Sequence, residues 1–142
     1  MYRRVLIATD GSEAAARAAT HAVALARRCD ATLHALSVVE TRTAYDNAIV
    51  DPEVVRENLR AESEAAVAAV SRRAESANVP VEATVEAGVP HEVIVDYVDR
   101  EAIDLVVLGA KGKSAFKTAL LGSVTEAVLR SGTAPVLVVD GA

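Results

Sequence analysis

The sequence contains few aromatic residues and has an excess of acidic over basic side chains. It has no Trp, one Phe and three Tyr among 142 residues, so its core must be packed with aliphatic side chains. Few aromatic rings also leave few platforms on which the bases of a single strand can stack. The formal net charge of −5 disfavours a phosphate backbone as a partner, because such a partner is bound by basic surfaces. We therefore expect no nucleic-acid partner.

Cysteines and long apolar runs are also scarce. Cys29 is the single cysteine, which excludes an intramolecular disulfide and a cysteine-rich zinc site. No apolar run approaches the ~18 residues that a membrane-spanning helix requires. The apolar run after Arg4 is limited to Val5–Ala8 and is too short for a signal peptide. We expect a cytoplasmic protein that has no membrane partner.

Short apolar runs alternate with helical patterns along the chain. The predicted strands cover residues 5–8, 31–39, 81–86, 105–108 and 135–139. Ser12 and Asp51 are suited to cap the helices that follow them, and Pro52 fits a first helical turn. Strands that alternate with helices predict right-handed crossovers and an α/β fold with a doubly wound parallel sheet. His34 falls within the second strand and has no metal-ligand partner at a recognisable spacing, so we interpret it as a packed or solvent-facing strand residue.

The most informative stretch follows the strand 105–108, whose unbroken apolar run predicts burial on both faces. Glycines occur at positions 109, 112 and 122, and Ser123 is a predicted N-cap that forms a capping box with Glu126. A backbone without Cβ atoms lets amides approach an anion, and a helix N-terminus adds unpaired amides with partial positive charge. The loop also carries three lysines: Lys111, Lys113 and Lys117. The pattern predicts a phosphate site. It is not a Walker A loop, because Gly109 lies only two residues before Gly112.

The spacing Gly109-x2-Gly112-x9-Gly122-Ser123 resembles the ATP-binding signature of the universal stress protein family. Three further segments resemble landmarks of that family: residues 5–12 its first strand and turn, 88–90 the start of its third helix, and 134–139 its last strand. The resemblance implies that residues 1–142 form a single nucleotide-binding domain. It also implies a Rossmann-like (adenine nucleotide alpha hydrolase-like) fold, whose five-stranded parallel sheet has the order 3-2-1-4-5.

In that strand order the first and fourth strands are neighbours whose connections leave in opposite directions, and ligands bind at such a switch point. The implied cofactor is ATP, with Mg²⁺ or Mn²⁺. Amides around the glycines would hold the phosphates together with the Ser123 hydroxyl, and Asp10 would face the ribose or the metal. Val38 and Val39 would close one side of an adenine pocket. The implied site residues are Ala8, Thr9, Asp10, Val38, Val39, Leu108, Gly109, Lys111, Gly112, Gly122, Ser123 and Val124.

The resemblance implies an ATP-binding stress-response regulator that acts through nucleotide-dependent dimer or partner interactions. Two alternatives stay open. One is a slow ATPase or nucleotide-dependent transferase, for which Asp10 is the only obvious base and no catalytic residue is assigned. The other is an interaction module that binds no nucleotide.

Two further expectations concern segments outside the glycine loop. The run 135–139 is uncharged and β-forming, and a bare edge strand of that kind predicts a homodimer. The polar stretch from Glu40 to Asp51 is longer than the usual connection and predicts either a mobile cover for the site or an insertion.

Overall fold

The computed structural model describes residues 1–40, 51–113 and 120–140. The stretch 41–50, which makes up most of the predicted cover or insertion, and Lys117 lie outside these residues. The described elements are β1 (Arg4–Ala8), α1 (Glu13–Cys29), β2 (Thr32–Glu40), α3 (Pro52–Ser76), β3 (Val81–Gly88), α4 (Pro90–Arg100), β4 (Leu105–Gly109), α5 (Ser123–Ser131) and β5 (Val136–Val139).

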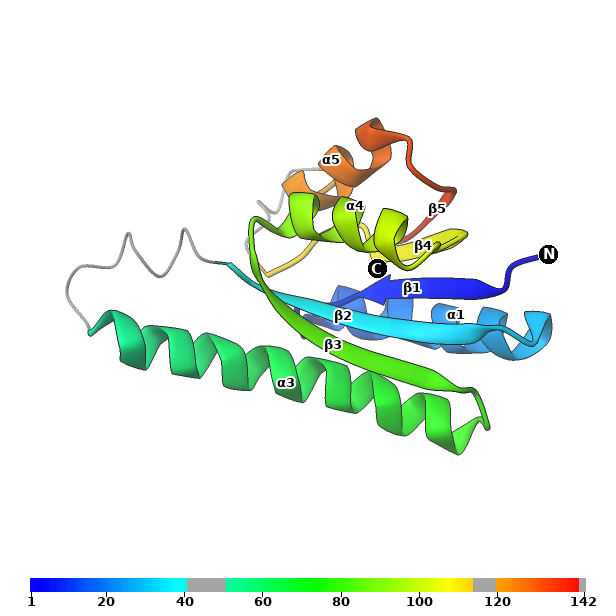
Figure 1. Ribbon diagram of the computed structural model, residues 1–142, viewed down its shortest axis with the longest axis horizontal. Coiled ribbons are helices and arrows are strands. Elements are labelled where there is room, and N and C mark those ends of the chain that lie inside the picture. The colour runs from blue at the N-terminus through cyan, green and yellow to red at the C-terminus, as the bar shows by residue number, and fades with distance from the viewer. Residues whose placement is uncertain (41–50, 114–119, 141–142) are drawn as a thin grey trace.

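The strands form one parallel sheet in the order β3-β2-β1-β4-β5, as Figure 1 shows. This confirms the predicted doubly wound α/β fold and its strand order. The chain leaves β1 through α1 toward β2, and it leaves β4 through α5 toward β5 on the other side. The carboxyl ends of β1 and β4 therefore form the switch point of the sheet.

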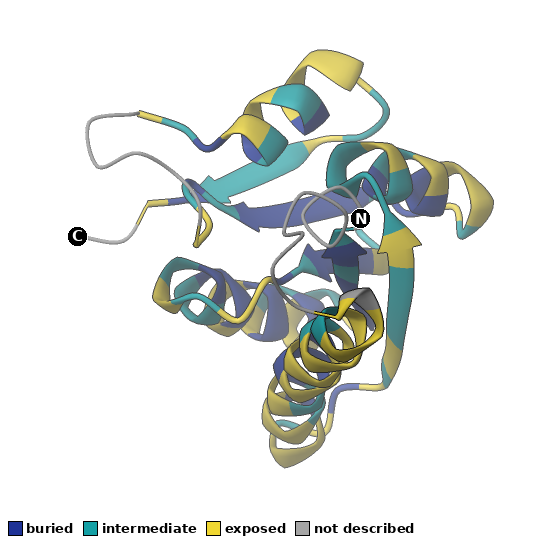
Figure 2. Cartoon of the chain, turned by 90° about the vertical axis from the view of Figure 1, so that its left-hand side faces the viewer, coloured by how far each residue is buried: buried dark blue, intermediate teal, exposed yellow. Residues whose placement is uncertain are grey.

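Helices cover both faces of the sheet and turn their buried sides toward it, as Figure 2 shows. The face under α1 and α3 buries Val5, Ile7 and Leu33 together with a row of small residues from α1. The opposite face, under α4 and α5, buries Leu6, Leu36 and other aliphatic side chains. The buried α1 residues are Ala15, Ala18, Ala19, Ala22, Val23 and Ala26. Because most of these are alanines, α1 can lie close to the strands.

The predicted N-caps of α1 and α3 are confirmed. The Ala15 amide donates to Ser12 Oγ at 3.2 Å, and the Glu53 amide donates to Asp51 Oδ1 at 3.0 Å. The predicted capping box at α5 is wrong, since Gly122 is the N-cap and Ser123 is the first helical residue. The Gly122 amide donates to the Ala110 carbonyl at 2.6 Å, and the Gly122 carbonyl accepts the first helical bond from Glu126 at 3.0 Å. These two bonds shift the start of the helix one residue earlier than the sequence pattern predicts.

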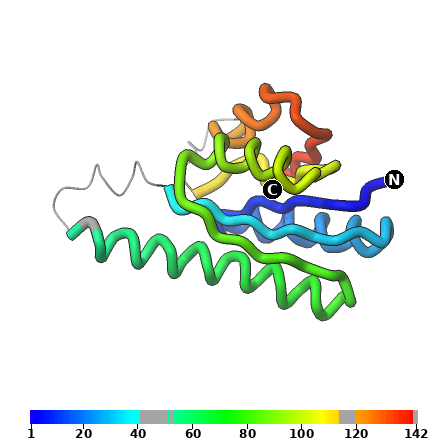
Figure 3. The backbone as a smooth tube through the Cα atoms, viewed as in Figure 1, coloured from blue at the N-terminus to red at the C-terminus, as the bar shows by residue number. Residues whose placement is uncertain are grey.

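Helix α3 is longer than the strands it covers, and Figures 1 and 3 show its N-terminal half extending past their carboxyl ends. Its C-terminal half buries Ala66, Val70 and Ala74, whereas Val55 and Leu59 in its N-terminal half are only half-buried. The projecting half of α3 therefore forms a side wall at the switch point. Among the described helices, none combines the length and the apolar character needed to cross a bilayer.

Candidate functional site

A cavity of about 300 Å³ lies at the switch point of the sheet. It is bounded by the carboxyl ends of β1, β2 and β4, the glycine loop, the start of α5 and the projecting half of α3. Every residue assigned from the sequence except Val39 lines it: Ala8, Thr9, Asp10, Val38, Leu108, Gly109, Lys111, Gly112, Gly122, Ser123 and Val124. The fold thus brings together two segments that lie about a hundred positions apart.

One side of the cavity is apolar. It is formed on the α4/α5 face of the sheet by Leu36, Val38, Ile94 and Leu108. Val39 does not line it, contrary to the sequence-based expectation. Successive strand side chains point to opposite faces, so Val39 lies on the α1/α3 side and is 5% exposed.

Another part of the wall is the glycine loop, where the backbone is closely packed. A Cβ at Gly109 would lie 3.0 Å from the carbonyl carbon of Ala14, so a side chain there would push β4 away from α1. A Cβ at Gly112 would overlap the Asp10 carboxylate. The backbone at these two positions can keep its place only without side chains. Gly109 and Gly112 both line the cavity, so backbone without side chains forms this part of its wall.

The N-terminus of α5 opens on the same side. Gly122 has no side chain that could cap the helix, and the first amides of a helix have no carbonyl partner within it. These amides and the aligned peptide dipoles give the helix start a partial positive charge. Thr125 Oγ1 donates to the Gly109 carbonyl at 2.8 Å, which ties the first turn of α5 to the end of β4. The arrangement is suited to an anion such as phosphate.

Asp10 fastens the turn after β1 to the glycine loop. Its Oδ1 accepts from the Ser12 amide at 2.9 Å, and its Oδ2 accepts from the Lys113 amide at 2.8 Å. The carboxylate thus bridges two loops of the cavity wall and also lines the cavity.

The charges around the cavity are mixed. Lys111 and Lys113 line it from the loop, Glu40 lines it from the end of β2 and Glu62 lines it from α3. Lys113 Nζ lies 3.9 Å from Glu62 Oε2, and both side chains are more than half exposed. This contact links the glycine loop to α3 across the mouth of the cavity.

A family model described as the universal stress protein family matches residues 1–140. The chain belongs to the universal stress protein family. Universal stress protein MJ0531 of Methanocaldococcus jannaschii is 35% identical over 140 residues, which cover 98% of this chain and 82% of that relative.

Two solved structures extend the comparison. Protein MJ0577 of the same organism has a TM-score of 0.88 and 30% identity, with 100% of this chain and 98% of that chain covered. A universal stress protein solved in complex with cAMP has a TM-score of 0.70 and 26% identity, with 98% and 97% covered. Structures related to this universal stress protein thus include one that holds an adenine nucleotide.

Several cavity residues were not predicted from the sequence. Leu59, Glu62 and Ser63 come from α3, and Thr125 comes from α5. The α3 residues follow an ordinary helical pattern, and nothing in that pattern indicates that half of the helix extends beyond the sheet. For Thr125 a signal was available, because it follows the glycine motif within the first turn of the helix.

Proposed function

We propose that this universal stress protein binds ATP and regulates a stress response, its nucleotide state altering dimer or partner interactions. The observation that carries the proposal is the cavity at the switch point. There, apolar side chains, a glycine loop and an uncapped helix N-terminus line one cavity. An apolar wall suits a purine ring, and amides with partial positive charge suit phosphates.

The volume of the cavity and a related solved structure both support an adenine nucleotide as the ligand. A volume of about 300 Å³ falls at the lower end of the range for small-molecule sites. The relative in complex with cAMP holds the adenine, ribose and phosphate that this cavity would take. In this chain Val38 would face the base, and the Ser123 hydroxyl would join the α5 amides at the phosphates.

Asp10 is placed to assist a metal that accompanies the nucleotide. Mg²⁺ keeps several waters and is bound through one or two carboxylates together with substrate phosphates. The Asp10 carboxylate at the cavity wall fits that pattern for Mg²⁺ or Mn²⁺. Asp10 would then share its oxygens between the metal and the two amides that it already binds.

The two hydrogen bonds that Asp10 accepts support ATP binding rather than ATP hydrolysis. Phosphoryl transfer depends on a residue that positions the attacking group. Asp10 is the candidate base, and each of its oxygens already accepts an amide hydrogen bond. We therefore expect any ATPase or transferase activity to be slow.

The decisive experiment begins with the purified, untreated protein. Its bound small molecules are released by denaturation and identified by mass spectrometry, and the emptied protein is then titrated with ATP by calorimetry. We expect an adenine nucleotide in the extract and a micromolar dissociation constant, about −8 kcal/mol. An empty protein that gives no heat with ATP would favour the interaction module without nucleotide.

We also propose a homodimer through β5. In the described sheet β5 is paired on one side only, with β4, and the strand Val136–Val139 carries no charge. The opposite edge strand, β3, carries Glu82 and Glu86, which discourage pairing. Two copies of β5 related by a twofold axis would pair antiparallel, so the β5 edge of each chain would be covered by the other chain.

The dimer is tested by Val138→Lys, which places a charge on the bare edge. We expect this variant to sediment as a monomer, whereas the matched variant Ala87→Lys on β3 keeps the dimer. A wild-type chain that sediments as a monomer at high concentration would contradict the proposal.

A further inference from the structure

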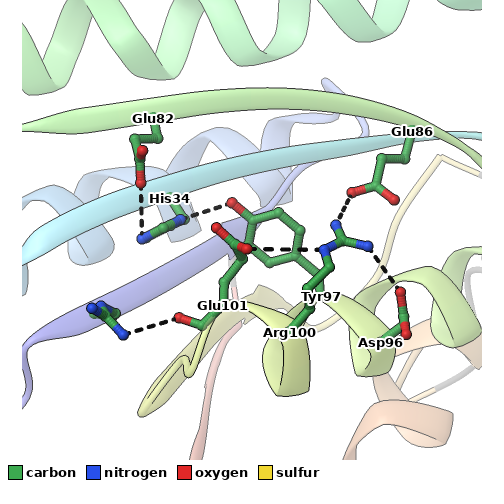
Figure 4. Close-up of polar contacts among 8 residues, drawn as sticks. His34, Glu82, Glu86, Asp96, Tyr97, Arg100 and Glu101 are labelled. Carbon is green, nitrogen blue, oxygen red and sulfur yellow. Dashed lines mark hydrogen bonds and ion pairs between the residues drawn. The ribbon is translucent and has the colours of Figure 1, made fainter.

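A second polar cluster lies toward the amino end of the sheet, away from the cavity described above. It consists of His34 on β2, Glu82 on β3 and Glu101 at the C-cap of α4. One ligand atom from each residue lies within 4.8 Å of the other two. The three residues border an open cavity of about 520 Å³. Figure 4 shows them gathered between the sheet and the end of α4.

His34 is held in a fixed orientation. It is 3% exposed, and its Nδ1 lies 2.7 Å from the hydroxyl of Tyr97, which is equally buried. His34 and Glu82 are register partners on neighbouring strands, so their side chains share one face of the sheet. The other ring nitrogen, Nε2, lies 3.4 Å from Glu82 Oε2. Figure 4 shows the ring between these two partners.

The distance between His34 and Glu82 matches two ligands of one metal ion. Zinc binds histidine nitrogen and carboxylate oxygen at about 2.0–2.2 Å. Two such atoms on a tetrahedral ion are separated by about 3.4 Å. Glu101 supplies the third ligand from the helix end. Its exposed contact with Arg100 Nε, at 3.9 Å, is weak enough to exchange for a metal bond.

The surroundings of His34 also fit a metal ligand. A metal on Nε2 requires the ring proton to be on Nδ1, where it would donate to the Tyr97 hydroxyl. Ligating histidines usually make such an outer bond, which fixes the tautomer and the ring orientation. Burial lowers the pKa of His34, with Arg4 acting in the same direction and Glu82 and Glu101 acting against it.

We propose that His34, Glu82 and Glu101 form a binding site for a divalent transition metal of the zinc class. One imidazole and two carboxylates give the ion three protein ligands of total charge −2, and the open cavity leaves a position for water. Imidazole selects Zn²⁺, Co²⁺ or Ni²⁺ over Mg²⁺, which prefers oxygen ligands. The site would therefore take a different ion from the one expected beside a nucleotide.

The first test is a calorimetric titration of the untagged, nucleotide-free full chain with Zn²⁺ and separately with Mg²⁺. We expect one Zn²⁺ per chain and no Mg²⁺ at this cluster. Glu82→Gln and Glu101→Gln should each weaken Zn²⁺ at least tenfold, because each removes a ligand charge while preserving shape. The control Glu92→Gln removes the same charge from the first turn of α4 and should bind Zn²⁺ like the wild type. Equal affinity in all four proteins, or no Zn²⁺ binding by the wild type, would overturn the proposal.

The second test reads the His34 ring directly. Long-range ¹H–¹⁵N NMR spectra, assigned with His34→Gln, report which nitrogen carries the proton. On adding Zn²⁺ we expect Nδ1 to remain protonated and the Nε2 signal to move to the position of a metal-bound nitrogen. His34 signals that do not respond to Zn²⁺ would show that the ion binds elsewhere. Because the protein is free of nucleotide, either result is independent of ATP binding.

Discussion

The candidate sites at the two ends of this sheet are formed by different parts of the chain, backbone at one end and side chains at the other. At the carboxyl end, the wall that faces an anion is made of backbone: the loop after Gly109, the close approach at Gly112 and the uncapped start of α5. At the amino end, the cluster around His34 is made of side chains from three elements. The first site depends on the absence of Cβ atoms, and the second depends on individual ligand atoms.

This difference predicts opposite sensitivities to substitution. Peptide amides bind an anion without help from side-chain charge, so the carboxyl-end site should tolerate the loss of charges but not added carbon atoms. Metal ligands act through single atoms, so the amino-end site should tolerate neutral bulk at a distance but not an isosteric loss of charge. Three variants test the comparison, and they follow from the largest expected effect on ligand affinity to the smallest.

Gly122→Val should have the largest effect. A Cβ at Gly122 would lie 3.4 Å from Lys111 Cα and 3.5 Å from the Gly112 amide nitrogen, both ordinary contacts. Valine is acceptable at a helix N-cap in this fold, since Val89 occupies that position in α4. The variant should therefore fold, while its methyl groups occupy the space where a phosphate would meet the amides. We expect ATP affinity to fall at least about a hundredfold, or about 2.7 kcal/mol.

Titrating the Gly122→Val variant with both ligands compares the two sites in one protein. ATP calorimetry measures the first effect, and Zn²⁺ calorimetry on the identical sample should give the wild-type affinity. Ala24→Val adds similar bulk on the exposed side of α1 and serves as the control. An unchanged ATP titration for Gly122→Val would contradict the assignment of the glycine loop.

The carboxyl-end site was largely predictable because its signal is local. Each predicted strand ends within two residues of the observed one, and all assigned site residues except Val39 line the cavity. Val39 does not line it, because alternation along β2 turns its side chain to the other face of the sheet. Ser123 was misassigned because its residue type favours an N-cap, whereas a bond from Gly122 to Ala110 decides where the helix starts.

The amino-end cluster was not predicted because its residues are scattered over the sequence. His34 looks like an isolated strand residue, and Glu82 belongs to an ordinary alternating strand. They become neighbours only through the β2–β3 register, which pairs His34 with Glu82. Glu101 joins them only because α4 ends against that side of the sheet. Once the strand order had been inferred, aligning the two strands could have suggested the first pair but not the third residue.

Tyr97→Phe should produce the intermediate effect, and only at the amino end. The substitution removes the hydroxyl that lies 2.7 Å from His34 Nδ1 while keeping the buried ring. Loss of such an outer partner typically weakens metal binding about 10- to 100-fold. Zn²⁺ calorimetry should show a decrease of this size, and ATP calorimetry should show none. Wild-type Zn²⁺ affinity in this variant would mean that the hydroxyl does not support the ligand.

Replacing Lys111, Lys113 and Lys117 together with glutamine should have the smallest effect, because the comparison assigns phosphate binding to the backbone. The Lys113 side chain is 53% exposed, and its Nζ lies 3.9 Å from Glu62 Oε2, so its charge is screened by water and salt. We expect ATP affinity to fall less than about tenfold, or about 1.4 kcal/mol, and its dependence on salt to flatten.

The control for the lysines is the triple substitution of Arg27, Arg28 and Arg72 by glutamine, which removes the same charge from exposed helical positions outside the cavity wall. If long-range attraction alone mattered, both triple variants would lose similar affinity, and both losses would vanish at high salt. If the loop lysines also contact the phosphates, their variant would remain weaker than the control at high salt. Complete loss of ATP binding in the lysine variant would reverse the comparison, because the carboxyl-end site would then also depend on side chains.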